Sequence, residues 1–140
     1  MNMIDVIGGK VSQKEIAFNV VAKMIDELMP RLRTLEITVR IKDVKDAIAY
    51  CMMEDNNRQF EIEISRNLSL KDFVTALCHE MVHVKQFARK ELCAEVSGSL
   101  TRWKKSKVSE STDYWDLPWE KEAYRLEEKL AQKVWDANIL

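Results

Sequence analysis

The sequence predicts an α+β fold in one domain spanning residues 1–140: an N-terminal helix, a three-stranded antiparallel sheet, a second helix, a long loop and a C-terminal helix. Two observations predict this class. Apolar residues recur at the spacing of a buried helix face in three separate segments. Between the first two segments, apolar and polar residues alternate with the period of a β-strand. Helices combined with an antiparallel sheet in one domain indicate the α+β class.

The first predicted helix begins at Ser12-Gln13-Lys14-Glu15, which has the residue pattern of a capping box. It ends at Pro30, because the residue before a proline avoids the helical conformation. Between these limits, apolar residues should form one buried face. They are Ala17, Val20, Val21, Met24, Ile25 and Leu28.

Three strands are predicted after this helix. Leu35 to Lys42 and Phe60 to Ile64 alternate apolar and polar residues, so each should have one buried and one solvent-facing side. Ala47 to Met53 is almost continuously apolar, which is typical of a central strand. Polar turns at 43–46 and 54–57 connect the strands. Because connections this short usually join antiparallel neighbours, we expect a meander in sequence order.

The second predicted helix begins near Ser69 and extends to about Lys90. His79, His83 and Gln86 fall on one of its faces, roughly opposite an apolar stripe. One side of this helix should therefore pack on the core while the other lines a cleft. The stripe consists of Leu70, Phe73, Val74, Leu77, Met81, Val84 and Ala88.

The segment from Glu91 to Leu117 has weak periodicity, so we expect a long loop with a short helix near Leu92 to Leu100. A long loop inside a compact domain is often a lid or a binding loop. Asp116 should cap the last helix, which has Pro118 in its first turn. The apolar face of this helix consists of Ala123, Leu126, Leu130 and Val134.

Composition excludes several classes of protein. Of 140 residues, 46% are hydrophobic and 32% charged, as in ordinary globular domains. The net charge of −1 provides no general attraction to nucleic acid or anionic membranes. No apolar run approaches the roughly 18 residues of a membrane span, and Met1 to Lys10 lacks the layout of a signal peptide. Cys51, Cys78 and Cys93 indicate reduced thiols, so we expect a cytoplasmic protein.

The residues His79-Glu80-Met81-Val82-His83 form the pattern H-E-x-x-H and contain both histidines of the chain. Residues four positions apart on a helix share a face, so the two imidazoles can reach one metal ion. Glu80 lies about a quarter turn away, from where its carboxylate can reach water on the ion without being a ligand. This donor type suits zinc. The pattern predicts a zinc site with Glu80 as general base.

A catalytic zinc ion usually has three protein ligands, and no third histidine is present. We therefore expect an acidic ligand after the second helix. Glu120 and Glu122 lie on the last helix, which can pack against the second helix and hold a carboxylate rigidly. Because they are two positions apart they point in nearly opposite directions, so only one can be the ligand. The other acidic candidates are Glu91 and Glu95, very close to the second helix, Glu110 and Asp113, in the predicted loop, and Asp116.

The H-E-x-x-H motif followed by Pro118-Trp119-Glu120-Lys121-Glu122-Ala123-Tyr124 resembles small SprT-like metallopeptidases of phages and bacteria, and more broadly the gluzincins. The resemblance covers most of the chain. It implies a zincin-like fold and zinc-dependent hydrolysis of peptide bonds. A Glu-x-x-Ala element supplies the third ligand in gluzincins, which implies Glu120 as ligand and Ala123 at the helix contact. Tyr124 departs from the Asp or Asn that many gluzincins have there, so Glu122 remains the alternative.

In such an enzyme, Glu80 takes a proton from the attacking water and delivers it to the leaving amine. A peptide or protein substrate can add to the edge of the sheet, and the predicted third strand, Phe60 to Ser65, is the expected edge. Candidate donors for stabilising the oxyanion are Tyr114, Tyr124 and Arg125.

Three neighbouring features are expected to be structural. Cys78 should be a buried thiol, and Trp115 and Trp119 should fix the last helix against the second one. The basic segment Arg102-Trp103-Lys104-Lys105-Ser106-Lys107 should be a solvated loop anchored by Trp103.

Two alternative functions remain open. A catalytically silent module, such as an inhibitor or host-takeover factor, would use zinc as a structural staple closed by a fourth ligand, such as Cys93 or Asp113. A DNA-associated protease would use the basic segment to contact nucleic acid. No membrane partner is expected, and no pattern predicts an oligomeric state.

Overall fold

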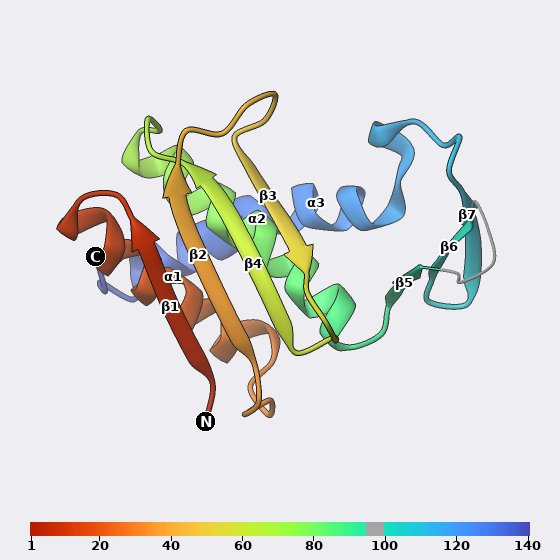
Figure 1. The fold of residues 1–140 in the computed structure, drawn as a ribbon, viewed down its shortest axis with the longest axis horizontal. Coiled ribbons are helices and arrows are strands. Elements are labelled where there is room, and N and C mark those ends of the chain that lie inside the picture. Colours follow the sequence, from red (N-terminus) through yellow and green to blue (C-terminus); the bar gives the residue numbers. More distant parts are fainter. Residues whose placement is uncertain (95–99) are drawn as a thin grey trace.

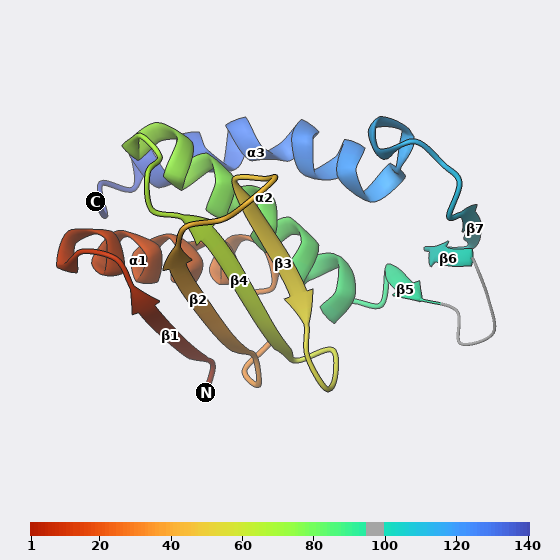
Figure 2. The ribbon, with the colours of Figure 1, turned by 45° about the horizontal axis from the view of Figure 1, so that its top comes forward.

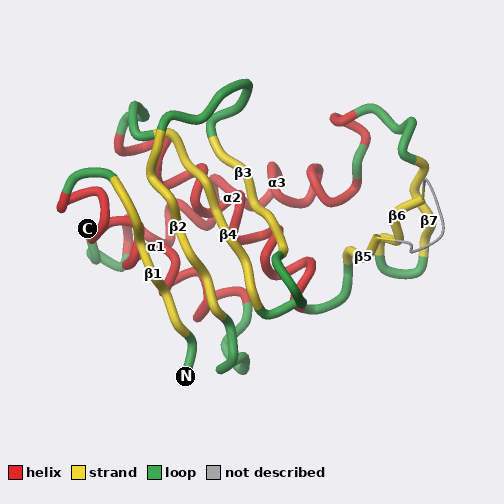
Figure 3. The backbone as a smooth tube through the Cα atoms, viewed as in Figure 1, coloured by secondary structure: helices red, strands yellow, loops and turns green. Residues whose placement is uncertain are grey.

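The computed structural model describes residues 1–94 and 100–140. It has an α+β architecture, in which α1 and α2 cover one face of a four-stranded sheet and α3 packs against α2 (Figures 1 and 2). A smaller three-stranded sheet lies beyond one end of α2 and α3 (Figure 3). The elements are β1 (Met3–Gly8), α1 (Val11–Leu28), β2 (Glu36–Lys42), β3 (Ala49–Met53), β4 (Gln59–Ser65), α2 (Leu70–Ala88), β5 (Leu92–Ala94), β6 (Leu100–Trp103), β7 (Ser106–Ser109), the 3₁₀ turn η1 (Tyr114–Asp116) and α3 (Pro118–Asp136).

The main sheet is mixed, with the strand order β1-β2-β4-β3. β1 and β4 both run parallel to β2, whereas β3 pairs antiparallel with β4. The predicted three-stranded antiparallel meander is therefore wrong, because β4 lies between β2 and β3. The predicted alternation is confirmed: Ile37, Val39 and Ile41 of β2 are buried, and the other face of the strand carries polar side chains such as Arg40, which pairs with Glu61.

β3 was predicted to be the central strand, but it forms an edge of the sheet, and β4 lies inside it. Side-chain size gives the physical reason. The core-facing residues of β4 are Phe60, Ile62 and Ile64, each at most 2% exposed, whereas those of β3 are Ala49 and Cys51, which are partly buried. The larger side chains bury more apolar area and take the central place. The small side chains of β3 leave a hollow between this strand and α2.

No strand is predicted at the N-terminus, but Met3–Gly8 pairs with β2 along its whole length as β1. Its apolar residues lie on both faces, as the exposure of Met3 and Ile7 shows, so the alternation that reveals a strand is absent. Gly8 has φ +83°, and a Cβ at this position would collide with the carbonyl oxygen of Ile41. Only glycine fits where β1 turns toward α1.

The helix termini differ slightly from the prediction. α1 begins at Val11, and the Gln13 side chain accepts a hydrogen bond from the backbone N–H of Lys10 (2.9 Å), so Ser12 is not its capping residue. Asp116 belongs to η1, and Leu117 takes the N-cap position of α3. Except for Leu70, which is 47% exposed, the predicted apolar faces of α1 and α2 lie in one common core with β2 and β4.

The segment after α2 is not a structureless loop. Its described residues include β5, β6 and β7, which form a small antiparallel sheet. Where the short helix near Leu92 to Leu100 was expected, Leu92–Ala94 is a strand, and residues 95–99 lie outside the described part of the chain. Short strands with few apolar residues give only a weak periodic pattern, which explains the incorrect prediction.

Candidate metal centre

Helix α2 positions both histidines. The hydroxyl of Ser69 caps the helix by accepting a hydrogen bond from the backbone N–H of Asp72 (3.2 Å). Leu77 and Met81 are fully buried on the core side. The polar side of the helix is also covered, because α3 packs on it and leaves His79, Glu80 and His83 only 6–7% exposed. The motif therefore lies in a confined polar site between two helices.

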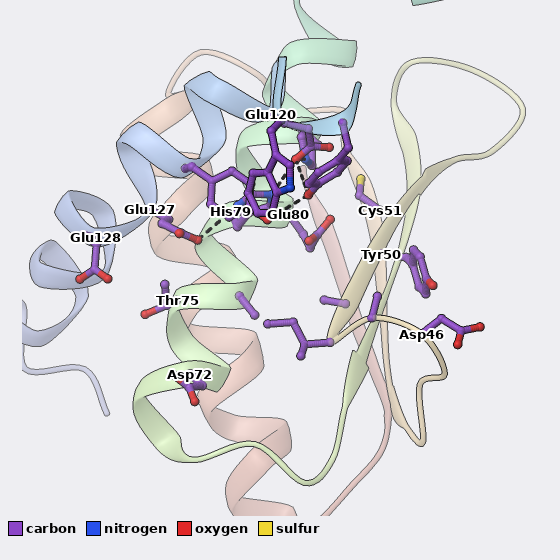
Figure 4. A pocket seen from close by; sticks show the side chains of 18 residues that line it. Asp46, Tyr50, Cys51, Asp72, Thr75, His79, Glu80, Glu120, Glu127 and Glu128 are labelled. Atoms are coloured by element: carbon purple, nitrogen blue, oxygen red, sulfur yellow. Dashed lines mark hydrogen bonds and ion pairs between the residues drawn. The ribbon is translucent and has the colours of Figure 1, made fainter. Parts of the chain in front are cut away.

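His79, His83 and Glu120 meet at one point. The Nε2 atoms of the two imidazoles lie 3.0 and 3.1 Å from the same oxygen of Glu120, Oε1 (Figure 4 shows the surrounding pocket). One ligand atom from each residue lies within 4.8 Å of the others. In a tetrahedral zinc site with bonds of about 2.0–2.1 Å, neighbouring ligand atoms are roughly 3.3 Å apart. The two distances to Oε1 are close to this spacing, and the cluster could hold a metal ion.

Two further side chains orient the imidazoles. Glu127 lies 3.2 Å from Nδ1 of His79 through Oε2, and Gln86 lies 2.8 Å from Nδ1 of His83 through Oε1. These contacts direct each Nε2 toward Glu120, as outer-shell acceptors do in metal sites. Neither role was predicted. A signal for Glu127 is present in the sequence, since it follows Glu120 by seven positions and so lies about two turns along the same helix face.

Glu122, the alternative third ligand, points to a different set of partners. It accepts hydrogen bonds from Lys85 Nζ (3.0 Å) and from Gln86 Nε2 (3.1 Å), and Gln86 also donates to the backbone carbonyl of Trp119 (2.9 Å). Glu122 therefore holds Gln86, which contacts His83. Glu120 is therefore part of the histidine cluster, whereas Glu122 contacts Gln86 and Lys85 outside it.

The remaining acidic candidates do not join the cluster. Glu91 pairs with Lys85 (2.9 Å), and the cluster includes neither Glu110, Asp113 nor Asp116. Glu95 lies outside the described residues.

Electrostatics favour a charged cluster in the metal-free protein. Burial alone would lower the pKa of His79, but hydrogen bonds with Glu120 and Glu127 outweigh it and raise this pKa to about 9. The pKa of His83 is also raised, by Glu120 against the effect of burial. Burial would raise the pKa of Glu120, but the two imidazoles lower it to about 2. A carboxylate that is already ionised is thus held ready for a cation.

A cleft of about 730 Å³ opens onto the cluster between β3 and the helices α2 and α3 (Figure 4). Glu80 lines this cleft, and it makes no hydrogen bond or ion pair with any described residue. Burial raises its pKa, although the two histidines oppose this effect. A buried acid with a raised pKa beside a potential metal site is suited to taking and returning a proton.

Aromatic side chains from η1 and α3 border the same cleft. The hydroxyl of Tyr114 donates to Oε1 of Glu120 (3.2 Å) and lies 3.0 Å from the hydroxyl of Tyr124. Arg125, the third predicted oxyanion donor, is not a lining residue: its side chain is 69% exposed and its Nη2 atom lies 4.0 Å from Oε2 of Glu122. Trp115 was predicted to anchor α3, but it is 68% exposed and lines the cleft.

The basic segment lies away from the cleft, on the β6–β7 hairpin. Trp103 packs against Trp119 with 6.3 Å between ring centroids, so the predicted anchoring by Trp103 is confirmed, but the segment is a β-hairpin and not the expected loop. The ring of Trp119, which was expected to fix the last helix against the second one, packs on this hairpin. Lys104 lies over the Trp103 ring at 5.1 Å. Contact with nucleic acid stays a prediction.

The three cysteines are free thiols, as expected. Cys78 is fully buried in the core, and burial raises its pKa to about 12. Cys51 lines the cleft from β3, where burial and then Glu80 raise its pKa. Cys93 is not part of the cluster.

Comparison of the chain with protein families, with curated protein sequences and with solved structures finds no match. In the described part of the chain, no helix combines the length and the hydropathy required to cross a membrane.

The two candidate third ligands on α3, Glu120 and Glu122, give a direct test of the ligand assignment. Replacing Glu120 by Gln should lower zinc affinity by more than about 100-fold, because an anionic ligand is lost. Glu122→Gln, two positions along the same helix, should lower it by about tenfold or less, because Glu122 acts only indirectly, by holding Gln86 and by pairing with Lys85. Competition with a chromophoric chelator measures both affinities. Equal losses, or a larger loss for Glu122→Gln, would contradict the assignment.

Zinc binding should release protons and should weaken at low pH. At about pH 7 the His79 imidazole keeps its proton, because its pKa is raised to about 9 in the metal-free protein, whereas Glu120 is already ionised. Zinc must displace this proton, so affinity rises with pH until about pH 9. Calorimetric titrations in buffers of different ionisation enthalpy measure the number of protons released. Affinity independent of pH over this range would argue against the arrangement.

Proposed function

We propose that this protein is a zinc-dependent metallopeptidase. The observation that carries the proposal is the position of the His79–His83–Glu120 cluster in a cleft, next to the buried carboxylate of Glu80, which has no partner among the described residues. Two histidines and one glutamate are the protein ligands of several catalytic zinc sites, which keep a fourth position for water or substrate. The donor types therefore fit zinc, and the adjacent acid fits hydrolysis.

The placement of the site within the fold supports the same function. The motif helix α2 packs beneath a mixed sheet whose edge strand, β3, runs along the cleft. The zincin-like fold that the resemblance to SprT-like peptidases implies is part of this proposal. The strand order moves the proposed substrate strand from β4 to β3, because β4 has neighbours on both sides.

Five lining residues and the edge of β3 have roles in this proposal. His79, His83 and Glu120 would hold zinc, which when bound supplies Lewis acidity toward water and the scissile carbonyl. Glu80 removes the proton of the attacking water and transfers it to the leaving nitrogen. The phenol of Tyr114 donates a hydrogen bond to the carbonyl oxygen as it gains charge. The free edge of β3 pairs with the backbone of an extended peptide and aligns it with Glu80.

An open site supports catalysis over a purely structural zinc ion. Structural zinc sites generally have four protein ligands. Among the described residues, neither Cys93 nor Asp113, the fourth ligands that a silent module would require, belongs to the cluster.

Replacing Glu80 by Gln should abolish proton transfer without removing a ligand. We expect kcat for a peptide substrate to fall by about 10²- to 10⁴-fold, the usual contribution of a general base. Zinc content should stay unchanged, as measured by elemental analysis. Glu63→Gln, on the outer face of β4, is the matched control and should leave both unchanged. Full turnover by the Glu80→Gln variant would overturn the proposed chemistry.

Tyr114→Phe should lower kcat on the order of 10²-fold with little change in KM, because the lost hydrogen bond acts on the developing charge. Tyr124→Phe is the comparison, since it removes the neighbouring hydroxyl but leaves the contact between Tyr114 and Glu120 in place. Steady-state kinetics with one fluorogenic peptide measures both variants. A larger loss of kcat in Tyr124→Phe would reassign the donor to that residue.

A further inference from the structure

The residues that line the cleft are far more acidic than the chain as a whole. The protein has 22 Lys and Arg against 23 Asp and Glu, so the two signs are balanced overall. No Lys or Arg occurs among the described residues that line the cleft, although six of them are acidic. These are Asp46, Asp72, Glu80, Glu120, Glu127 and Glu128.

Three of these acids have no role in the proposed zinc site. Glu120 and Glu127 contact the histidines, and Glu80 is the proposed base. Asp46, Asp72 and Glu128 make no ion pair with a described residue. They come from three elements, the turn before β3, the first turn of α2 and the middle of α3. Figure 4 shows Asp46 on the strand side of the pocket and the other two on the helix side.

A second observation indicates that the acidic cleft binds a cationic ligand. Glu80 is 93% buried (7% exposed), points into the same cleft and has no hydrogen-bond partner among the described residues. Low-dielectric walls lined by charges of one sign concentrate the field and attract the opposite charge. The exposed faces of Trp115 and Tyr50, which also line the cleft, offer surfaces for stacking a cation.

The spacing of these groups fits a peptide. Asp72 precedes His79 by seven residues, which is about 10 Å along the helix axis. An extended chain covers this distance in about three residues, at roughly 3.3 Å each. A lysine or arginine within three residues of the scissile bond would therefore lie between Asp72 and Glu128 on one wall and Asp46 on the other.

We propose that the cleft selects peptides that carry a lysine or arginine within about three residues of the cleaved bond, with Asp46, Asp72 and Glu128 as the residues that recognise the cation. The inference rests on the proposed peptidase function and adds the substrate class.

The experiment uses the zinc-loaded protein and a mixture of synthetic peptides of varied sequence, with cleavage sites identified by mass spectrometry. Lysine and arginine should be enriched over glutamate by about fivefold at one of the positions close to the cleaved bond, since one exposed ion pair is worth up to about fivefold in affinity. Cleavage without such enrichment overturns the selectivity and leaves the proposed function intact.

Two triple variants with the same change in net charge test whether Asp46, Asp72 and Glu128 recognise the cation. The triple variant Asp46→Asn, Asp72→Asn, Glu128→Gln should lose most of the preference for basic over acidic peptides. The control triple variant Asp26→Asn, Asp55→Asn, Glu110→Gln has the same change in net charge, outside the cleft, and should keep the preference. Equal behaviour of the two triple variants shows a general charge effect and overturns the assignment to these residues.

Binding separates failure of the selectivity from failure of the peptidase function. Two labelled peptides that differ only by Lys or Glu at one position are titrated onto the Glu80→Gln variant at low salt, with fluorescence anisotropy as the readout. The Lys peptide should bind about fivefold more tightly, with a difference that shrinks as salt is added. Equal binding overturns the selectivity. If the Lys peptide binds more tightly but the wild-type protein cleaves no peptide, cation recognition is supported and only the peptidase function is refuted.

Discussion

The carboxylate of Glu120, shared between the imidazoles of His79 and His83, is the interaction on which the site depends. It joins the first turn of α3 to the middle of α2 through a single oxygen atom. The fully buried Ala123, one turn farther along α3, allows the two helices to approach closely. Because the three side chains carry complementary charge in the metal-free protein, the cluster is held together before any cation binds. A preformed site loses little conformational freedom when it takes up an ion.

The first turn of α3 is also held from outside the cluster. Lys85 of α2 bridges Glu91 and Glu122, at 2.9 and 3.0 Å, and thereby ties the segment after α2 to the start of α3. Trp103 of the small sheet packs on Trp119, directly before Glu120. These contacts give the β5–β7 sheet a structural purpose, since it fixes the helix turn that carries the carboxylate. The partly buried ion pairs contribute orientation more than net stability.

The cleft exists because the edge strand β3 has small core-facing side chains. With these side chains, this edge of the sheet buries less apolar area than β4 does. The same small side chains leave space between β3 and α2. The same strand exposes Tyr50, Met52 and Met53, and along its outer edge it pairs with no other described strand. Such an edge favours pairing with another extended chain. In the proposed function this property is used for binding substrate, and the surrounding carboxylates restrict which peptides are attracted.

Local patterns predicted the parts of the protein that depend on nearest neighbours along the chain. The spacing of His79 and His83 requires only a helix to bring both imidazoles to one side, and the alternation in β2 requires only one buried face. The ambiguity between Glu120 and Glu122 could not be removed in this way, because it depends on the rotation of α3 about its own axis against α2. The roles of Glu127 and Gln86 likewise arise from the meeting of two helices.

The strand order was also decided by tertiary structure. Periodicity indicates which face of a strand is buried but not which strand lies beside it. It therefore could not predict that β4 lies between β2 and β3, or that β1 pairs with β2. The sequence alone thus determined the helix, its two histidines and its acid. Only the packed fold decided which carboxylate completes the cluster and which strand borders the cleft, because both depend on competition among distant side chains for the same buried space.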